Sequence, residues 1–503
     1  MQPVMKSALA VLAALAALQP PAARATDALT LYSSARPGAL SPDAYRHGGR
    51  GQAIPGYAVV RHERELPLAR GRNTVRFTDV AALIDPTTVT FESLTDAAGT
   101  SVVEQNFQFD LVSTEKLLQR YVDRAISVDQ VRGNGVESFA GTLLSTAGGI
   151  TLRREDGVIQ ILPHNAGVRL PELPGGLITR PTLVWDVAAQ RAGAHRARVS
   201  YQTSGITWWT DYNVNYADGR DAHLCHLDIG AWVSIVNQSG ATYTDARLKL
   251  VAGDVQRVTP PGRVTPAAIA ARAMAMEDRA AGFEQKAFFE YHLYTLGRST
   301  TLPDNSTKQI ELFPAARRVP CEKTLVYYGA PGHAYGGGPM TDRNYGTSTN
   351  RKVDVYLGFR NAEQNNMGMP LPAGRIRVSK ADAADGTLEF IGEDAIDHTP
   401  RNEKVLIKLG SAFDVVGERR QLNFTVDTSR RTMIEEIEVK VRNHKKKEPV
   451  TVIAKENLYR WVNWQITAKT HDFEKQDART VHFPLKIAAG GETVLRYTVH
   501  YSW

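Results

Sequence analysis

The feature of this sequence that most restricts its fold is a long series of segments in which apolar and polar residues alternate, from about residue 195 to residue 503. Successive side chains of a strand point to opposite faces of a sheet, so this alternation predicts β-strands with one buried face. The spacing of these strands predicts that residues 195–503 form an immunoglobulin-like or related β-sandwich. The segments include DIGAWVSIVNQSG, KVDVYLGF, KVLIKLG and TVLRYTVHYSW.

One segment near residues 265–290 departs from the strand pattern. Thr265 and Pro266 are typical of a helix start, because proline is tolerated at the first helical position. The sequence that follows, AAIAARAMAMEDRAAGFEQKA, is rich in residues with high helix propensity. We therefore expect a helical insertion near 265–290 that packs on the sandwich.

Smaller modules are expected before the sandwich, because 503 residues exceed what one hydrophobic core usually organises. Residues 26–124 are predicted to form a β-rich module that ends in a short helix, STEKLLQRYVDR, with Ser113 as its N-cap. Residues 125–194 are predicted to form a small β unit and a linker that contains several prolines. The predicted fold class is therefore mainly β and multidomain.

The N-terminus has the pattern of a secretory signal peptide, residues 1–25. An apolar run, SALAVLAALAAL, follows Lys6 and precedes the small-residue cleavage pattern Ala23-Arg24-Ala25. The run is too short to span a bilayer. We therefore expect cleavage near Ala25, no transmembrane anchor, and a periplasmic or secreted protein.

The net charge argues against a nucleic-acid partner. The whole chain carries a formal charge of +7, and loss of Lys6 and Arg24 with the leader leaves +5. Nucleic-acid binding normally needs a concentrated basic face, whereas this charge is spread over a long chain. We expect no nucleic-acid partner.

The two cysteines, Cys225 and Cys321, leave two interpretations open. In an oxidising compartment they can form a disulfide. Alternatively, both are buried thiols that behave as small hydrophobic residues. The neighbouring sequence HLCHLD brings His223 and Cys225 to one face of a strand, but two ligands are too few for a metal site. We expect no metal and no other cofactor.

The segment SGITWWTDYNVNY contains the candidate binding residues Trp209 and Asp211. In a regular strand Trp208 faces the core, while Trp209 and Asp211 share the opposite face. A tryptophan ring beside a carboxylate is able to hold a sugar or a peptide. The alternative interpretation is that a neighbouring element covers the Trp209 ring, which then takes no part in recognition.

The segment GEDAIDHTPRNEK contains the candidate catalytic residues Glu393, Asp394, Asp397 and His398. Carboxylates near a histidine can perform general acid–base hydrolysis or bind a divalent ion. The alternative interpretation is a surface loop, because Asp and Asn favour turns.

The segment Tyr327 to Gly346, YYGAPGHAYGGGPMTDRNYG, is rich in glycine. It lacks the Lys-Ser/Thr ending of a phosphate-binding loop. It is typical of a long mobile loop or a binding loop, and its role stays open.

Many stretches of the chain resemble one bacterial family. They include ALIDPTTVTFESL, YQTSGITWWTDYNV, WVSIVNQSGATYTDARLKLVAGDV and FIGEDAIDHTPRNEKVLIKLGSAFDVVGERR. Together they are similar to the family catalogued as domain of unknown function 4139, a domain that also forms the C-terminal part of mucoidy inhibitor A proteins. The resemblance covers about Leu29 to Trp503 and implies the β fold and an envelope location. It implies no activity, cofactor or catalytic residue.

These features favour a non-enzymatic function, in which an exported cell-envelope or periplasmic protein binds or scaffolds an envelope protein or polysaccharide. The first alternative is a hydrolase or metal-dependent enzyme that acts on envelope polymers through the carboxylates of segment 393–398. The second alternative is an outer-membrane-associated β protein, because apolar and aromatic residues alternate from Leu495 up to the terminal Trp503.

Overall fold

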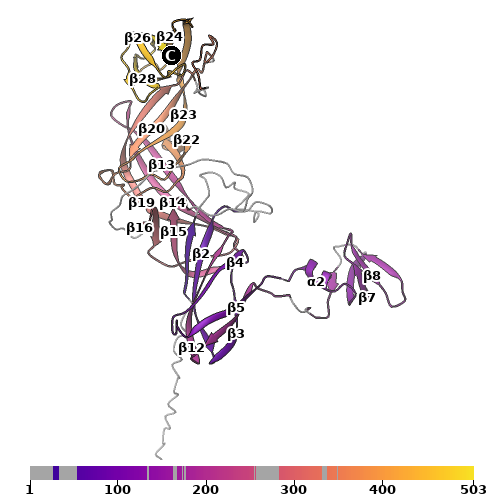
Figure 1. Cartoon of the computed structure of the whole chain (residues 1–503). Helices are drawn as coiled ribbons and strands as arrows, with labels where there is room; N and C mark the ends of the chain where they lie inside the picture. Colours follow the sequence, from indigo (N-terminus) through magenta and orange to yellow (C-terminus); the bar gives the residue numbers. More distant parts are fainter. Residues whose placement is uncertain are drawn as a thin grey trace, which may run out of the picture. The chain divides into compact units, whose positions relative to one another are not determined.

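The computed structural model describes residues 26–32, 54–110, 112–132, 135–162, 167–172, 174, 177–253, 255, 283–330, 337–347 and 349–503. Within these residues the protein is mainly β, with several sheets and one short α-helix (Figure 1). This part of the sequence prediction is confirmed. The contacts divide the chain into two compact units, of which unit 1 contains 1–29, 59–203 and 241–247, and unit 2 contains 30–58, 204–240 and 248–503.

Unit 1 contains a three-stranded antiparallel sheet in which β11 lies between β3 and β5, and β12 pairs with β4. The side chains of these strands meet around Trp185, whose ring centroid lies 5.4 Å from those of Phe77 and Phe91. Aromatic rings bury large areas, so this contact forms much of the local core. The strands of unit 1 are β3 (Gly71–Thr78), β4 (Ile84–Ser93), β5 (Thr100–Gln108), β11 (Thr182–Ala189) and β12 (Gly193–Thr203). The strands β1 (Thr26–Tyr32) and β2 (Tyr57–Leu68) have residues in both units.

A small five-stranded sheet, ordered β10-β6-β7-β8-β9, forms its own buried cluster together with the helix α2. The helix α2 (Thr114–Arg120) begins after Ser113, whose side chain accepts a hydrogen bond from Lys116 N at 3.3 Å. This confirms the predicted short helix and its N-cap. The strands are β6 (Ala125–Arg132), β7 (Gly135–Ser145), β8 (Ile150–Arg153), β9 (Ile159–Leu162) and β10 (Gly167–Arg169).

Unit 2 contains a sheet in which seven consecutive strands follow the order β22-β21-β13-β14-β19-β20-β23. Neighbouring strands are antiparallel except β13 and β21, which are parallel. We call this part the curled sheet, because β22 returns beside β23, where Lys408 N donates a hydrogen bond to Asp394 Oδ2 at 2.7 Å. The strands are β13 (Ile206–Asp218), β14 (Leu224–Asn237), β19 (Ser306–Tyr327), β20 (Lys352–Arg360), β21 (Gly374–Ala381), β22 (Leu388–Ile396) and β23 (Lys404–Asp427).

A glycine makes the return of β22 possible. At Gly392, a Cβ atom would lie 2.3 Å from the carbonyl oxygen of Leu409 on β23, and φ is +155°. Only glycine tolerates this approach and this conformation without strain. The inner face of the curled sheet is therefore closed at this side by backbone packed on backbone.

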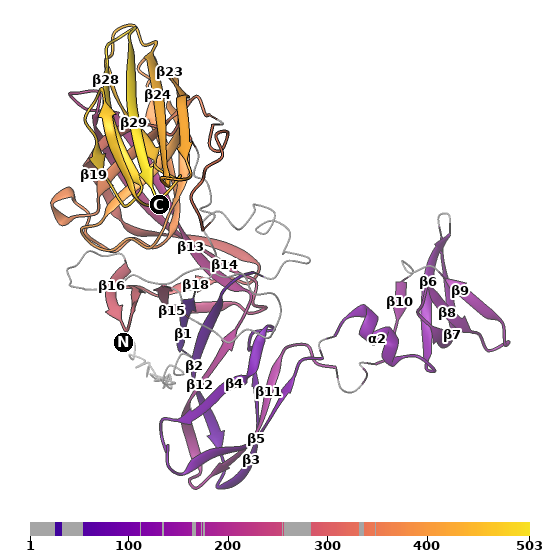
Figure 2. The same ribbon diagram turned by 45° about the horizontal axis from the view of Figure 1, so that its top comes forward.

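The long strands β19 and β23 continue beyond the curled sheet and take part in a second arrangement (Figures 1 and 2). There β23, β24, β29 and β26 are neighbours, while β19 pairs with β25, and β28 links β25 to β27. Side chains from both groups of strands share one buried apolar cluster, so the groups pack against each other. The added strands are β24 (Thr432–Asn443), β25 (Val450–Asn457), β26 (Trp464–Lys469), β27 (Glu474–Lys475), β28 (Thr480–Ile487) and β29 (Glu492–Ser502).

The predicted helical insertion near 265–290 is wrong for the residues that the structure describes. Residues 256–282 lie outside the described ranges, but β16 (Phe283–Phe288) is a strand that pairs with β17 (Tyr291–Leu296). β17 also pairs with β15 (Tyr243–Ala252). A partner strand with buried side chains therefore outweighs the helix propensity of the sequence FEQKA, since propensity is only a weak local preference.

The described half of the Gly-rich segment, residues 337–346, is anchored by a buried arginine. Arg460 is 0% exposed and donates hydrogen bonds to the carbonyl oxygens of Met340 and Asp342 at 3.0 and 2.8 Å. It donates a third to the carbonyl of Tyr345 at 3.2 Å. These bonds give this half of the predicted mobile loop fixed partners, whereas residues 331–336 lie outside the described ranges.

Candidate functional site

A pocket of about 240 Å³ lies at one end of the inner face of the curled sheet. Six of its strands contribute lining residues, so residues distant in the sequence meet there. We call it the inner pocket and define it by its lining residues: Tyr216, Asp218, Lys323, Val355, Leu357, Lys380, Ile391, Leu409, Gly410 and Ser411.

Strand alternation places these side chains at the pocket. Tyr216 has the same parity on β13 as the buried residues Tyr212 and Val214, and Lys380 has the same parity on β21 as Val378. Side chains two residues apart on a strand point to the same face. Tyr216 and Lys380 therefore extend the rows of apolar side chains on the inner face.

The polar side of the pocket is organised around Asp218. Lys380 Nζ lies 2.6 Å from Asp218 Oδ2, and the Tyr216 hydroxyl donates a hydrogen bond to Asp218 Oδ1 at 3.0 Å. The same ammonium group lies 5.4 Å from the centre of the Tyr216 ring, within the range of a cation–π contact. The three groups therefore contact one another across β13 and β21 at the solvent-facing side of the pocket, where the Lys380 and Asp218 side chains are 42% and 60% exposed.

Lys323 is the second ammonium group of the pocket, and its side chain is 23% exposed. Its contact with Glu448 Oε1 is long, at 3.8 Å, and the same carboxylate oxygen lies 3.0 Å from Lys445 Nζ. Coulomb attraction falls with distance and Glu448 is shared, so this contact neutralises Lys323 only in part. The pocket thus contains two cations and one carboxylate among its lining residues.

The environment shifts the pKa values of two lining residues in opposite directions. Burial alone would raise the pKa of Asp218, but the hydrogen bonds from Lys380 and Tyr216 and the charges of Lys380 and Lys323 outweigh it and lower the pKa. Burial, followed by the hydrogen bond to Asp218, raises the pKa of Tyr216. At neutral pH the pocket therefore presents an ionised carboxylate and a neutral phenol.

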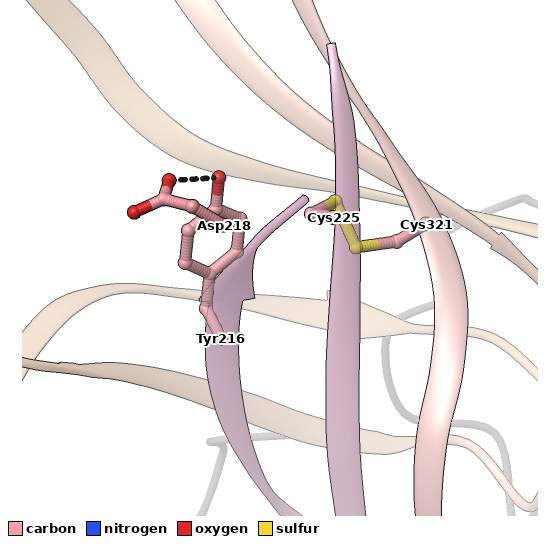
Figure 3. The surroundings of a disulfide bond; sticks show 4 residues. All are labelled: Tyr216, Asp218, Cys225 and Cys321. Carbon is pink, nitrogen blue, oxygen red and sulfur yellow. Dashed lines mark hydrogen bonds between the residues drawn. A yellow bond between two sulfur atoms is a disulfide. The ribbon is translucent and has the colours of Figure 1, made fainter. Parts of the chain in front are cut away.

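A disulfide lies beside the pocket. Cys225 and Cys321 are directly paired across β14 and β19, with Cα atoms 4.8 Å apart, and form a disulfide bond. Figure 3 shows Tyr216 and Asp218 on the strand next to Cys225. Asp218 is the register partner of Cys225, and Lys323 follows Cys321 by two residues on the same face. The bridge therefore joins β19, which carries Lys323, to β14, which pairs with the strand β13 that carries Asp218.

The structure places the predicted binding pair, Trp209 and Asp211, inside unit 2 and not at its surface. Both are 7% exposed, and Trp209 Nε1 donates a hydrogen bond to Asp211 Oδ2 at 2.7 Å. Asp211 Oδ1 also contacts the guanidinium groups of Arg375 and Arg377, at 3.4 and 3.2 Å. The carboxylate is thus engaged with groups of its own chain, and the geometry favours the covered-ring interpretation.

The predicted catalytic residues are neighbours in sequence whose side chains have separate partners. Glu393 Oε2 lies 3.5 Å from Arg377, Asp394 accepts the hydrogen bond from Lys408 N, and His398 Nδ1 accepts one from Ala373 N at 3.0 Å. Asp397 is exposed beyond the end of β22. Glu393 and Asp394 lie on opposite faces of the strand. Within the described residues, no group of three or more His, Cys, Asp and Glu side chains is arranged to hold a metal ion.

Sequence reasoning missed Tyr216, Asp218, Lys323 and Lys380 as site residues. The alternation in YNVNYAD indicates the face of Tyr216, and RIRVSK indicates that of Lys380. Nothing in the sequence shows that β13 and β21 are parallel neighbours or that β19 carries Lys323 to the same end. The missing information is strand order, which local pattern does not contain.

Comparison with known proteins adds no assignment, since no family model, curated protein or solved structure matches this chain. Within the described ranges, no helix combines the length and the hydrophobicity that a membrane crossing needs.

Proposed function

We propose that the protein is an exported, non-enzymatic binding or scaffolding protein of the cell envelope, periplasmic or secreted, with the inner pocket as its ligand site. The observation that carries the proposal is the pocket at the end of the curled sheet, whose lining combines two ammonium groups, a carboxylate and a phenol with apolar side chains. Pockets with mostly apolar linings and a few placed polar groups are the usual form of a ligand site. The partner or ligand is an envelope protein, a polysaccharide or a product of either.

Two features support export. The first is the leader pattern that ends at Ala25. The second is the disulfide between Cys225 and Cys321, because disulfides persist in oxidising compartments and are rare in the cytosol. The two features are independent, since one is read from the N-terminal sequence and the other from the pairing of β14 with β19.

The finer fold and family assignments are part of the same proposal. The shared buried cluster between the β23, β24, β29 and β26 group and the β25 and β28 group supports an immunoglobulin-like or related β-sandwich. The stretches quoted above support membership of the family catalogued as domain of unknown function 4139. Neither the fold nor the family implies an activity, so the proposed binding function depends on the inner pocket.

The chemistry of the pocket supports binding over catalysis. The Ser411 hydroxyl donates a hydrogen bond to Asp354 Oδ1 at 3.1 Å, and Asp354 is already paired with Lys408 Nζ at 2.6 Å. A nucleophilic serine instead needs a neighbouring base that can accept its proton. The ionised Asp218 is likewise engaged by two donors. These groups are arranged to fix charges in place, which suits recognition.

The test combines location with capture. The full chain, expressed with its leader in a bacterium, is fractionated and sequenced from its N-terminus; we expect a periplasmic or secreted protein that begins at Thr26. Immobilised mature protein is then exposed to envelope extract, and the Ile391→Trp variant, whose new side chain fills the inner pocket, is the comparison. An envelope component that the wild type retains and the variant does not retain supports the proposal.

Three outcomes would contradict it. Cytosolic protein with an intact leader would exclude export. Heat-modifiable migration in the outer-membrane pellet would favour the outer-membrane alternative. Turnover of envelope polymers that disappears in Asp394→Ala and persists in Ile391→Trp would favour the hydrolase with segment 393–398 as its site.

A further inference from the structure

The inner pocket has an apolar part and a charged part at opposite sides of its lining. Val355 and Leu357 from β20, Ile391 from β22 and Leu409 from β23 form the apolar walls. Lys323 on β19 and Lys380 on β21 supply the two ammonium groups, and Asp218 on β13 forms an ion pair with Lys380. A ligand that satisfies both parts must itself be amphipathic.

The net charge of the lining selects the sign and size of the ligand charge. Two ammonium groups and one ionised carboxylate leave one positive charge among the lining residues, so a monoanion is favoured over a cation. The Asp218 carboxylate repels a dianion such as a phosphate monoester. Lysine supplies a point charge without the planar fork by which arginine recognises phosphate, which also favours a single carboxylate.

The two lysines have different tasks. Lys380 is committed to Asp218 at 2.6 Å, and this pair is held in turn by the Tyr216 hydroxyl. Lys323 has a long contact of 3.8 Å with Glu448, and its charge also acts on Asp218. A ligand carboxylate at ordinary ion-pair distance would interact with Lys323 more strongly than Glu448 does, because charge-assisted hydrogen bonds are shortest and strongest near 2.8 Å.

The pocket volume limits the length of the apolar part. The volume of about 240 Å³ is several times the roughly 30 Å³ that one water molecule occupies in the liquid, so the pocket accommodates several non-hydrogen atoms of a ligand. A carboxylate with a stem of about five carbons fits this volume, while a sugar polymer or a long acyl chain exceeds it. Only the end of a larger molecule can enter.

From these observations we propose that the inner pocket binds a single carboxylate carried on a short apolar stem, with Lys323 as the carboxylate anchor. The Lys380–Asp218–Tyr216 group positions the ligand and excludes dianions. This inference rests on the proposed function, because it names the ligand class of the same pocket. Two sources present this chemistry: a free short-chain carboxylic acid, and the C-terminus of a protein chain that ends in an aliphatic residue.

The test is calorimetric titration of the mature full-length protein with four small probes: hexanoate, hexanol, hexylamine and hexyl phosphate. We expect hexanoate to bind at least tenfold more tightly than the other three, since a hydrogen bond to a charged group contributes about one order of magnitude or more in affinity. Lys323→Met keeps the aliphatic stem and should weaken hexanoate binding about tenfold or more. The matched control is Lys404→Met, which removes an exposed lysine that is paired with Glu322 and does not line the inner pocket. This variant should leave hexanoate binding unchanged.

A second pair of probes distinguishes the two sources. N-acetyl-alanyl-valine and its C-terminal amide differ only in the carboxylate. Binding of the peptide acid and not the amide, with hexanoate weaker, assigns the site to a protein C-terminus, whereas the opposite order assigns it to a free acid. Preference for hexylamine or hexyl phosphate, absence of binding by all probes to a folded protein, or equal binding by Lys323→Met would overturn the inference.

These outcomes are distinct from failure of the proposed function. If Ile391→Trp abolishes capture from envelope extract while Lys323→Met binds as the wild type does, the pocket is a ligand site and the carboxylate inference is wrong. If the protein is cytosolic with its leader intact, the envelope role fails whatever the probes do.

Discussion

Replacement of Arg460 by methionine tests how the second arrangement of unit 2 is held together. The Arg460 guanidinium is fully buried, lies 3.9 Å from the centre of the Phe424 ring, and has its Nε atom 2.9 Å from Glu435 Oε1. The contact with Glu435 is an ion pair in which these two atoms are not aligned as a hydrogen bond. Methionine keeps the length and the apolar contact with Phe424 but removes the charge and every donor.

The expected loss of stability follows from the charge that is left behind. Glu435 is 1% exposed, so its carboxylate would lose its closest cation in a dry environment. Removing one partner of a buried ion pair typically costs about 3–5 kcal/mol. Arg419 also interacts with the Glu435 charge and offsets part of the loss. We therefore expect a local destabilisation near the lower end, about 3 kcal/mol.

Hydrogen exchange read by mass spectrometry is the suitable assay, because a multidomain chain does not have one well-defined free energy of unfolding. Amides of residues 337–347 and of β24 should exchange roughly 100-fold faster in Arg460→Met, the factor that corresponds to about 3 kcal/mol. The control is Arg430→Met, since Arg430 is 84% exposed and its contact with Asp427 is 3.7 Å. A change below threefold in Arg460→Met, or an equal change in the control, would refute the reasoning. Glu435→Gln added to Arg460→Met should recover part of the loss, because the stranded charge is then removed.

Three further predictions concern the disulfide, the tyrosines and the pocket. Replacing Cys225 and Cys321 by serine opens a link over 96 residues, which the chain-entropy model equates with at most about 4.7 kcal/mol; we expect a lower melting temperature of unit 2, and an unchanged value in the double variant would contradict this. Burial raises the pKa of Tyr459 to about 12, above its unfolded value near 10, so its contribution to stability is complete below pH ~10 and declines as the pH rises toward 12. Denaturation followed from pH 9 to 12 should show this decline, and Tyr459→Phe should reduce the slope; a slope that the variant leaves as it was would argue against it. Lys380→Met should raise the pKa of Asp218, measured by carboxyl NMR titration, because its closest cation is lost, and an unshifted Asp218 would show that Lys380 does not set this value.

Much of the fold was predictable because a strand with one buried face shows alternating apolar and polar residues in its own sequence. The alternation in KVLIKLG and in TVLRYTVHYSW corresponds to the start of β23 and to β29, where buried residues recur at every second position. The short helix after Ser113 was predictable for the same reason, since its cap and its apolar stripe lie within one segment. The strand β16 at the end of the Ala-rich segment was not predictable, because Phe283–Phe288 is extended only through its pairing with β17.

The candidate site, unlike the strands, was not predictable from local sequence. The sequence offers Trp209 and Asp211 as an aromatic ring beside a carboxylate, yet Arg375 and Arg377 contact Asp211 from β21, more than 160 residues later in the chain. The carboxylates of segment 393–398 are close in sequence, but a strand sends Glu393 and Asp394 to opposite faces. Closeness along the chain was therefore a poor guide to closeness of side chains.

By itself, the sequence determined that the chain is mainly extended, that one face of each strand is apolar, and that its N-terminus has the pattern of a leader. These properties depend on neighbours two to four positions apart, which the sequence displays directly. Tertiary structure alone decided which strands are adjacent, that β22 returns beside β23, and that Lys323, Lys380 and Asp218 meet at one pocket. The physical reason is that strand pairing is made by backbone hydrogen bonds common to all residues, so the order of strands is selected by the packing of the whole unit and not by any local segment.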